Sequence, residues 1–174
     1  MKRILTIIFS AAIALAVQSC GVFGQSSAEP NEAVLNASPS NGIYVSVNTI
    51  MGKIGRPVHS IDGYYLQVKD GKVYSYLPFI GESYYSTGYG KSSGIEFDGC
   101  PVSITESQTR HSRVWSFTAI QDQETIEVTL EFTESGGATV TCRSNHRSMM
   151  RYLGEVTTPP SKKERPHIFG QKRG

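Results

Sequence analysis

The sequence predicts an all-β domain, mainly an antiparallel meander, that closes as a barrel-like sheet or folds into a two-sheet sandwich. Short runs of alternating apolar and polar residues recur along the chain, and tight-turn residues separate them. No window of twelve or more residues in the body has the 3.6-residue period of an amphipathic helix, so a parallel sheet with crossover helices is excluded. About eight strands must close or pack in order to protect their edges.

The first half of the domain contains the strongest local signal. Apolar and polar residues alternate over 43–49, and residues 57–61 form a short extended segment. Residues 64–69 and 72–77 flank Asp70-Gly71, which favours the positive φ angles of a two-residue hairpin turn. Pro78 cannot donate a hydrogen bond to a strand ladder and is expected to end this hairpin.

The second half repeats the same pattern. The expected strands are a short apolar run at 95–99, then 114–120, 126–133, 138–143 and 148–156. Turn residues lie between the last four: Asp122-Gln123, Gly136-Gly137 and Ser144-Asn145-His146.

The start of the chain has the features of an export signal. Lys2-Arg3 precedes an apolar run of roughly 14 residues, which is short for a membrane-spanning helix of about 20. The residues Val17-Gln18-Ser19-Cys20 resemble a bacterial lipobox, which implies a lipid-modified Cys20 as the mature N-terminus. The alternative is ordinary signal cleavage that leaves Cys20 incidental. We therefore expect an exported outer-membrane lipoprotein on the periplasmic face.

These features divide the chain into four parts. Residues 1–19 are the lipoprotein signal peptide and 20–41 a flexible tether poor in large apolar residues. Residues 42–157 are the β domain, and 158–174 a disordered basic tail. Although the whole chain has a net charge of +2, residues 41–156 hold ten Lys/Arg and twelve Asp/Glu. The basic character lies in the ends, so the fold is not expected to bind nucleic acid.

Two cysteines remain if Cys20 is acylated. Cys100 and Cys142 could form a disulfide in an oxidising compartment, or each could be a small buried apolar side chain. These cysteines and four scattered histidines have no metal-ligand spacing, so we expect no metal and no cofactor.

The stretch over residues 79–94 is rich in Gly, Ser and Tyr and contains Phe79, Tyr84, Tyr85 and Tyr89. Tyrosine offers a large contact area with a hydrogen-bonding tip, which suits recognition of a sugar, a peptide or a protein. The same rings could instead fold back and plug an open end of the β core. Both interpretations remain open from the residues alone.

Catalytic patterns are weak. Gly90-Lys91-Ser92 lacks the first glycine of a phosphate-binding loop and the helix that should follow it. Glu82, Glu96 and Asp98 flank the Tyr-rich loop and would be the candidates for a glycosidase-type hydrolase.

Several segments between about residue 42 and residue 156 match a known family: Tyr64-Tyr-Leu-Gln-Val, Tyr76-Leu-Pro-Phe-Ile-Gly81, Tyr84, Tyr89-Gly90, Gly94-Ile-Glu-Phe-Asp98, Gly136 with Ala138, Ser144-Asn-His-Arg147 and Tyr152-Leu-Gly-Glu-Val156. On these residues the chain resembles the Domain of Unknown Function 4251 family, exported proteins of Bacteroidetes-type bacteria. The resemblance implies a mostly β domain behind a signal sequence and carries over no catalytic or binding residue.

The function expected from these observations is a non-catalytic binding or envelope-assembly module that uses loop 79–94 to contact an envelope protein, peptide or glycan. One alternative is a periplasmic carrier with an apolar ligand inside the β body, and another is the hydrolase. A large apolar cavity would favour the carrier, converging carboxylates the hydrolase, and a filled core with exposed tyrosines the binding module.

Overall fold

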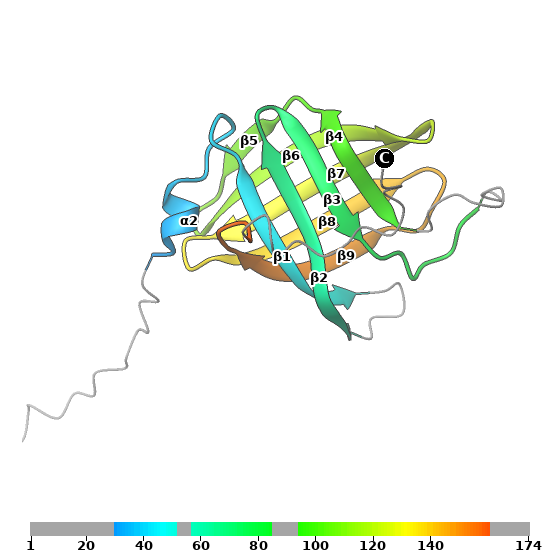
Figure 1. Cartoon of the computed structure of the whole chain (residues 1–174), viewed down its shortest axis with the longest axis horizontal. Coiled ribbons are helices and arrows are strands. Elements are labelled where there is room, and N and C mark those ends of the chain that lie inside the picture. The colour runs from blue at the N-terminus through cyan, green and yellow to red at the C-terminus, as the bar shows by residue number, and fades with distance from the viewer. Residues whose placement is uncertain (1–29, 52–56, 85–93, 161–174) are drawn as a thin grey trace, which may run out of the picture.

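A computed structural model describes residues 30–51, 57–84 and 94–160. In these ranges, one short helix precedes nine strands (Figure 1). The elements are α2 (Glu32–Leu35), β1 (Ile43–Met51), β2 (Pro57–Lys69), β3 (Lys72–Leu77), β4 (Ile95–Pro101), β5 (Thr105–Gln108), β6 (Ser112–Gln121), β7 (Glu124–Thr133), β8 (Gly137–Ser144) and β9 (Met150–Val156). The all-β prediction is confirmed.

The strands form one antiparallel sheet in the order β4-β3-β2-β1-β9-β8-β7-β6-β5. Two meanders, β1–β4 and β5–β9, are therefore joined where the first strand pairs with the last. In that pair Val45 lies opposite Val156 and Ile50 opposite Tyr152. The predicted hairpin is present: Asp70 and Gly71 have φ angles of 52° and 68°, and Lys69 pairs with Lys72.

The sheet curls so far that its two edge strands are neighbours along the chain. β4 and β5 lie at opposite ends of the strand order, yet only residues 102–104 connect them. Because each residue of extended chain covers at most about 3.6 Å, the two edges must lie close together in space. Figure 1 shows the resulting shape, with β1–β4 crossing in front of the other strands. Of the two predicted forms, the structure has the barrel-like one.

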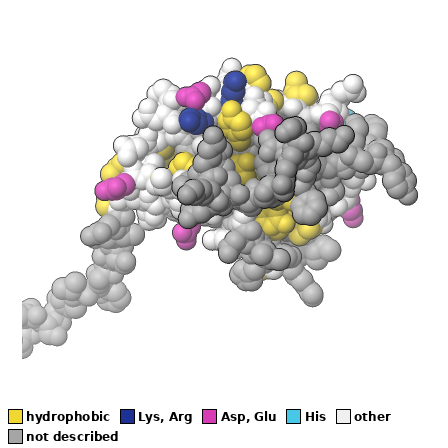
Figure 2. Space-filling model, in the orientation of Figure 1, with side chains coloured by type: hydrophobic (Ala, Val, Ile, Leu, Met, Phe, Trp, Pro, Cys, Tyr) yellow, Lys and Arg dark blue, Asp and Glu magenta, His cyan; other side chains and the backbone are white. Residues whose placement is uncertain are grey.

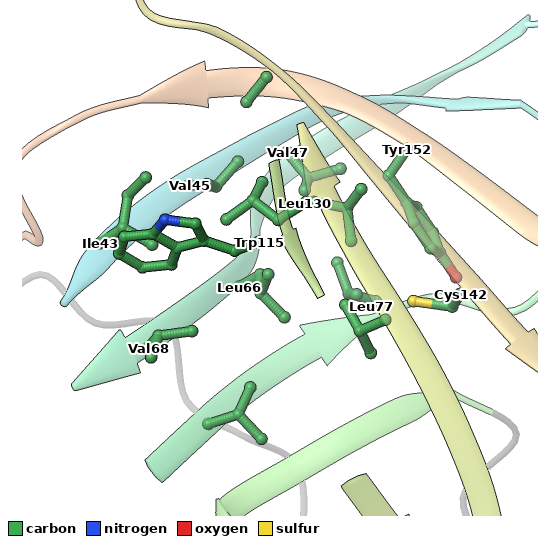
Figure 3. Packing of buried hydrophobic residues seen from close by; sticks show 14 of the residues in the cluster. Ile43, Val45, Val47, Leu66, Val68, Leu77, Trp115, Leu130, Cys142 and Tyr152 are labelled. Atoms are coloured by element: carbon green, nitrogen blue, oxygen red, sulfur yellow. The ribbon is translucent and has the colours of Figure 1, made fainter. Parts of the chain in front are cut away.

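Side chains of alternating strand residues fill the interior. β7 is the clearest case, since its burial alternates strictly with the inward residues Ile126, Val128, Leu130 and Phe132. Trp115 and Tyr152 are the largest fully buried side chains (Figure 3). Burying one large apolar side chain contributes about 1.5–3 kcal/mol, so this filled core is the main source of stability.

Two expectations need correction. The tether was expected to reach residue 41, but α2 is folded onto the domain, and Val34 and Ala37 are buried in its core. The strand β5 was not predicted, because all four of its residues are exposed and leave no alternating pattern. The rest of the expected tether and the signal peptide lie outside the described residues, as does the tail beyond residue 160.

Within the part of the chain that the structure describes, no helix has the length and apolar character needed to cross a membrane.

Candidate functional site

The residues after β3 run along the β8–β9 connection at the end of the sheet opposite α2 (Figure 1). The N–H of Tyr84 donates to the carbonyl of His146 at 2.9 Å, and the N–H of Ser148 donates to the carbonyl of Glu82 at 2.9 Å. Ser83 and Arg147 form an isolated antiparallel bridge between these bonds. The described part of the Tyr-rich loop therefore has a backbone fixed to a neighbouring segment.

Gly81 permits this close approach. A Cβ atom at this position would lie 2.1 Å from the Ser148 hydroxyl oxygen and 2.9 Å from the ring of Phe79. The same hydroxyl accepts a hydrogen bond from the N–H of Glu82 at 2.9 Å. A larger residue at position 81 would force the two segments apart.

A buried ion pair lies beneath the loop. Arg147 Nε donates to both carboxylate oxygens of Glu124, at 3.0 and 2.8 Å, and Nη2 donates to Oε2 at 2.6 Å. The remaining guanidinium nitrogen, Nη1, donates to the carbonyl of Gly94 at 2.9 Å. The hydroxyl of Ser144 also donates to Glu124. The pair thus joins the start of β4, the start of β7 and the β8–β9 connection.

Burial and hydrogen bonding act in opposite directions on Glu124. Burial alone would raise its pKa, but the hydrogen bonds from Arg147 and Ser144 and the charge of Arg147 hold that pKa below its usual value. The carboxylate is therefore charged at neutral pH and serves as a fixed acceptor. All three guanidinium nitrogens of Arg147 donate hydrogen bonds to protein groups. This geometry indicates an ion pair that stabilises the fold.

Gln121 closes the sheet at the same end. Its Oε1 accepts from the N–H of Glu96 at 3.0 Å, and its Nε2 donates to the carbonyl of Gly94 at 3.3 Å. This side-chain amide connects the end of β6 to the edge strand β4, where ladder bonds would otherwise be needed.

The aromatic residues of the predicted loop fall into different environments. Phe79 is half-buried, packs against the core and lies under the Arg147 guanidinium at 5.4 Å. Tyr84 is 59% exposed, and Ile80 and Met149, on the same two segments, are 49% and 44% exposed. Phe79 thus packs on the core, whereas Tyr84 lies on the surface. Tyr85 and Tyr89 are outside the described residues.

The three acidic residues considered for a hydrolase lie on different elements. Glu96 and Asp98 are alternate residues of β4, opposite Tyr76 and Tyr74, whereas Glu82 lies in the loop after β3. Among the described residues, three hollows of about 340–690 Å³ have none of these acids in their linings. Paired carboxylates for glycoside hydrolysis receive no support from this placement.

The disulfide that the cysteine count allowed is not formed, and both thiols are free. Cys142 points from β8 into the core, where burial raises its pKa to about 12. Cys100 lies on β4 with its Sγ 3.7 Å from the carbonyl oxygen of Ile120 on β6. The buried apolar interpretation therefore describes Cys142. In the described ranges, no three His, Cys, Asp or Glu residues are grouped to hold a metal ion.

Sequence reasoning missed the three residues that close this end: Gln121, Glu124 and Arg147. A signal for two of them was present, because Gln121 and Glu124 continue the inward positions of β6 and β7 and pair across the turn. Polar residues at inward positions next to a turn require a buried partner. Arg147 had no such signal, since it directly follows the expected turn at Ser144-Asn145-His146.

A second aromatic surface was also missed. Tyr44, Tyr65, Tyr74 and Tyr76 occupy the outward positions of β1–β3, between buried neighbours such as Val45, Leu66 and Leu77. The rings of Tyr44 and Tyr65 stack with centroids 5.6 Å apart, and Tyr64 stacks on Tyr76 at 5.3 Å. Figure 2 shows hydrophobic side chains on this face beside both acidic and basic ones.

Comparison with known proteins adds a family but no assigned activity. No curated protein matches the chain. The model of a family described as a domain of unknown function (DUF4251) matches residues 25–156, a span that includes the short helix and all nine strands. The chain therefore belongs to the DUF4251 family.

Proposed function

We propose that the protein is a cell-envelope lipoprotein, anchored through Cys20 at the periplasmic face of the outer membrane, whose β domain is a non-catalytic binding module. Its contact surface is the loop end, defined here by Ile80, Tyr84 and Met149. Its partner is an envelope protein, peptide or glycan.

The observation that carries the proposal is an exposed aromatic side chain on a fixed backbone. Tyr84 is 59% exposed although its N–H is bonded to His146, and Ile80 and Met149 project from the two segments that these bonds join. A backbone that is already ordered loses little conformational entropy on binding, which favours contact with a partner. The filled core beneath them supports a binding module over a carrier with an internal ligand.

The binding part of the proposal is tested by site-specific photo-crosslinking in the native envelope. A photoreactive residue replaces Tyr84 in one variant and Ile120, which is 63% exposed on β6, in the control. We expect a discrete adduct from position 84 alone. The purified adduct partner should bind the wild-type domain, and Tyr84→Ala with Met149→Ala should weaken that binding roughly tenfold or more.

Thermal melting of the same double variant separates recognition from folding. Because both side chains are exposed, their removal should change stability by no more than about 0.5 kcal/mol. Equal adducts from positions 84 and 120, or binding that survives the double substitution, would refute the loop end as the contact surface.

The anchor is tested by Cys20→Ser, which should move the protein from the membrane fraction to the soluble fraction.

A further inference from the structure

The last described residues of the chain lie against the tyrosines on the outside of the sheet. The N–H of Thr157 donates to the carbonyl of Tyr44 at 3.0 Å, which extends the β1–β9 pairing by one residue. The chain then leaves β9 and crosses over β1 and β2. A hollow of about 340 Å³, here called the tyrosine groove, is lined by Tyr44, Tyr65, Gln67, Lys69, Asp70 and Tyr74 together with Pro159 and Pro160.

Tyrosine rings and consecutive prolines are complementary. A Pro-Pro segment favours the extended polyproline II conformation, has no N–H groups to satisfy and presents flat apolar rings to aromatic side chains. Tyr44, Tyr65 and Tyr74 are each half-buried, and so is Pro160. In this structure, prolines of the chain itself, Pro159 and Pro160, lie beside these tyrosines.

The charge and the length of the chain after residue 160 would allow it to extend this contact. The fourteen residues that follow carry five Lys/Arg and one Glu, a formal charge of +4. Tyr74, which lines the groove, lies on β3, and the adjacent edge strand β4 places Asp98 opposite Tyr74 and Glu96 opposite Tyr76. Two residues of polyproline II chain cover about 6 Å, more than the strand spacing of about 4.8 Å, so Lys162 and Lys163 can reach these carboxylates from Pro160.

We propose that the tyrosine groove is the docking site of the chain's own C-terminal segment, residues 157–174. Pro159 and Pro160 pack on the tyrosines, and the basic residues that follow contact the carboxylates of β4 and the faces of nearby rings. The segment binds as a strap in the same molecule. This site lies on the strand faces of β1–β4, away from the loop end, and does not depend on the function proposed above.

The first test uses the chain from residue 21 onward, labelled with 3-fluorotyrosine and followed by ¹⁹F NMR. Each resonance is assigned by Tyr→Phe substitution. In a variant with Lys162→Glu, Lys163→Glu and Arg165→Glu, the resonances of Tyr74 and Tyr76 should move toward their positions in a chain that ends at Thr158. The resonances of Tyr84 and of buried Tyr152 should stay in place as internal controls.

High salt should move the wild-type resonances of Tyr74 and Tyr76 in the same direction, because it screens the contacts between tail and carboxylates. Unchanged Tyr74 and Tyr76 signals in both the triple variant and the truncated chain would overturn the proposal. This readout needs no partner molecule, so it can fail or succeed independently of the loop-end crosslinking.

The second test measures binding in trans. A labelled peptide of residues 157–174 should bind the chain that ends at Thr158 and should not bind the full chain, whose groove is occupied. Tyr74→Ala in the truncated chain, or Pro159→Ala with Pro160→Ala in the peptide, should weaken binding roughly tenfold or more, and Tyr84→Ala should leave it unchanged.

Three outcomes of the second test contradict the strap. Equal binding by the truncated and full chains would show that the groove is open in the full chain. No binding by a truncated chain with an intact thermal transition would remove the groove as a peptide site. A full-length dimer that becomes a monomer on truncation would assign the groove to the tail of a second copy. If truncation unfolds the domain, the ¹⁹F comparison of wild type with the triple variant decides alone.

Discussion

At the scale of single residues, the pair formed by Glu124 and Arg147 has the largest expected effect. The two residues are 6% and 7% exposed, and the carboxylate accepts from both Arg147 and Ser144. Taking two charges out of water is costly, but removing one partner leaves the other charge buried without compensation. Substitution of one partner is therefore expected to destabilise the domain strongly, even where the intact pair adds no net stability.

We predict that Glu124→Gln destabilises the domain by about 3–5 kcal/mol at pH 7. It should also flatten the dependence of stability on pH. Folding holds the pKa of Glu124 below the 4.5 of a free side chain, so the unfolded chain takes up a proton first as the pH falls. The stabilisation from this carboxylate is complete above about pH 5 and is lost as the pH drops through the folded pKa.

Urea unfolding at several pH values between 3 and 7 checks this prediction. The control is Glu127→Gln, the same change at an exposed position of β7. Wild type and the control should lose stability in acid more steeply than Glu124→Gln. Parallel curves for all three proteins would mean that Glu124 has no shifted pKa in the folded state.

At the scale of elements, the short helix α2 is part of the fold and closes one end of the core. Asn31 caps it: its side-chain oxygen accepts from the N–H of Ala33 at 2.9 Å, and its amide nitrogen donates to the carbonyl of Val156 at 2.9 Å. Val34 enters the core, and its carbonyl accepts from Arg113 at 3.4 Å. A four-residue helix cannot be stable alone, so these tertiary contacts maintain it.

Arg113 joins several elements at the α2 end of the sheet, as Arg147 does at the opposite end. It donates to Glu106 from Nε at 2.9 Å and from Nη2 at 2.6 Å, while its guanidinium lies 5.1 Å from the ring centre of Phe132. Trp115 Nε1 donates to the same carboxylate oxygen at 3.0 Å. The hydrogen bonds from Trp115 and Arg113 lower the pKa of Glu106. Both ends of the curled sheet therefore combine an Arg–Glu pair with an aromatic ring.

We predict that Val34→Ala lowers stability by about 0.5–2 kcal/mol, since it removes buried methyl groups from the closed end of the core. The adjacent Leu35→Ala is the matched control, because Leu35 is 68% exposed and its removal should cost less than about 0.5 kcal/mol. Thermal or urea unfolding of the two variants measures the difference. Equal effects at both positions would show that α2 does not contribute to the core.

At the scale of the whole molecule, the pairing of β1 with β9 makes the two meanders one cooperative unit. Each meander alone would expose an edge strand and half of the core, since β1 and β9 share a ladder that starts at Val45 and Val156. The short β4–β5 connection and Gln121 hold the opposite edges together. Neither half therefore has a complete core of its own.

We predict a single unfolding transition. The chain has one tryptophan, Trp115, which is buried in the second meander, whereas Tyr44, Tyr65, Tyr74 and Tyr76 report on the first. Tryptophan emission, far-ultraviolet circular dichroism and the fluorotyrosine signals of β1–β3 should give coincident urea midpoints. Midpoints that differ between Trp115 and the tyrosines would show that the meanders unfold separately.

The sequence by itself determined the all-β class, most strand positions and the hairpin at Asp70-Gly71, because alternation and turn chemistry are local properties of the chain. Only the tertiary structure decided three other features: the curled single sheet, the helix α2 within the domain, and the burial of Glu124 with Arg147. The reason is that each depends on residues far apart in sequence. Arg147 meets Glu124 only after β7 and β8 have paired, and the tyrosines of β1–β3 form one surface only after their strands align. Local patterns specify which way a side chain faces along its strand, and the closure of the sheet specifies what it meets there.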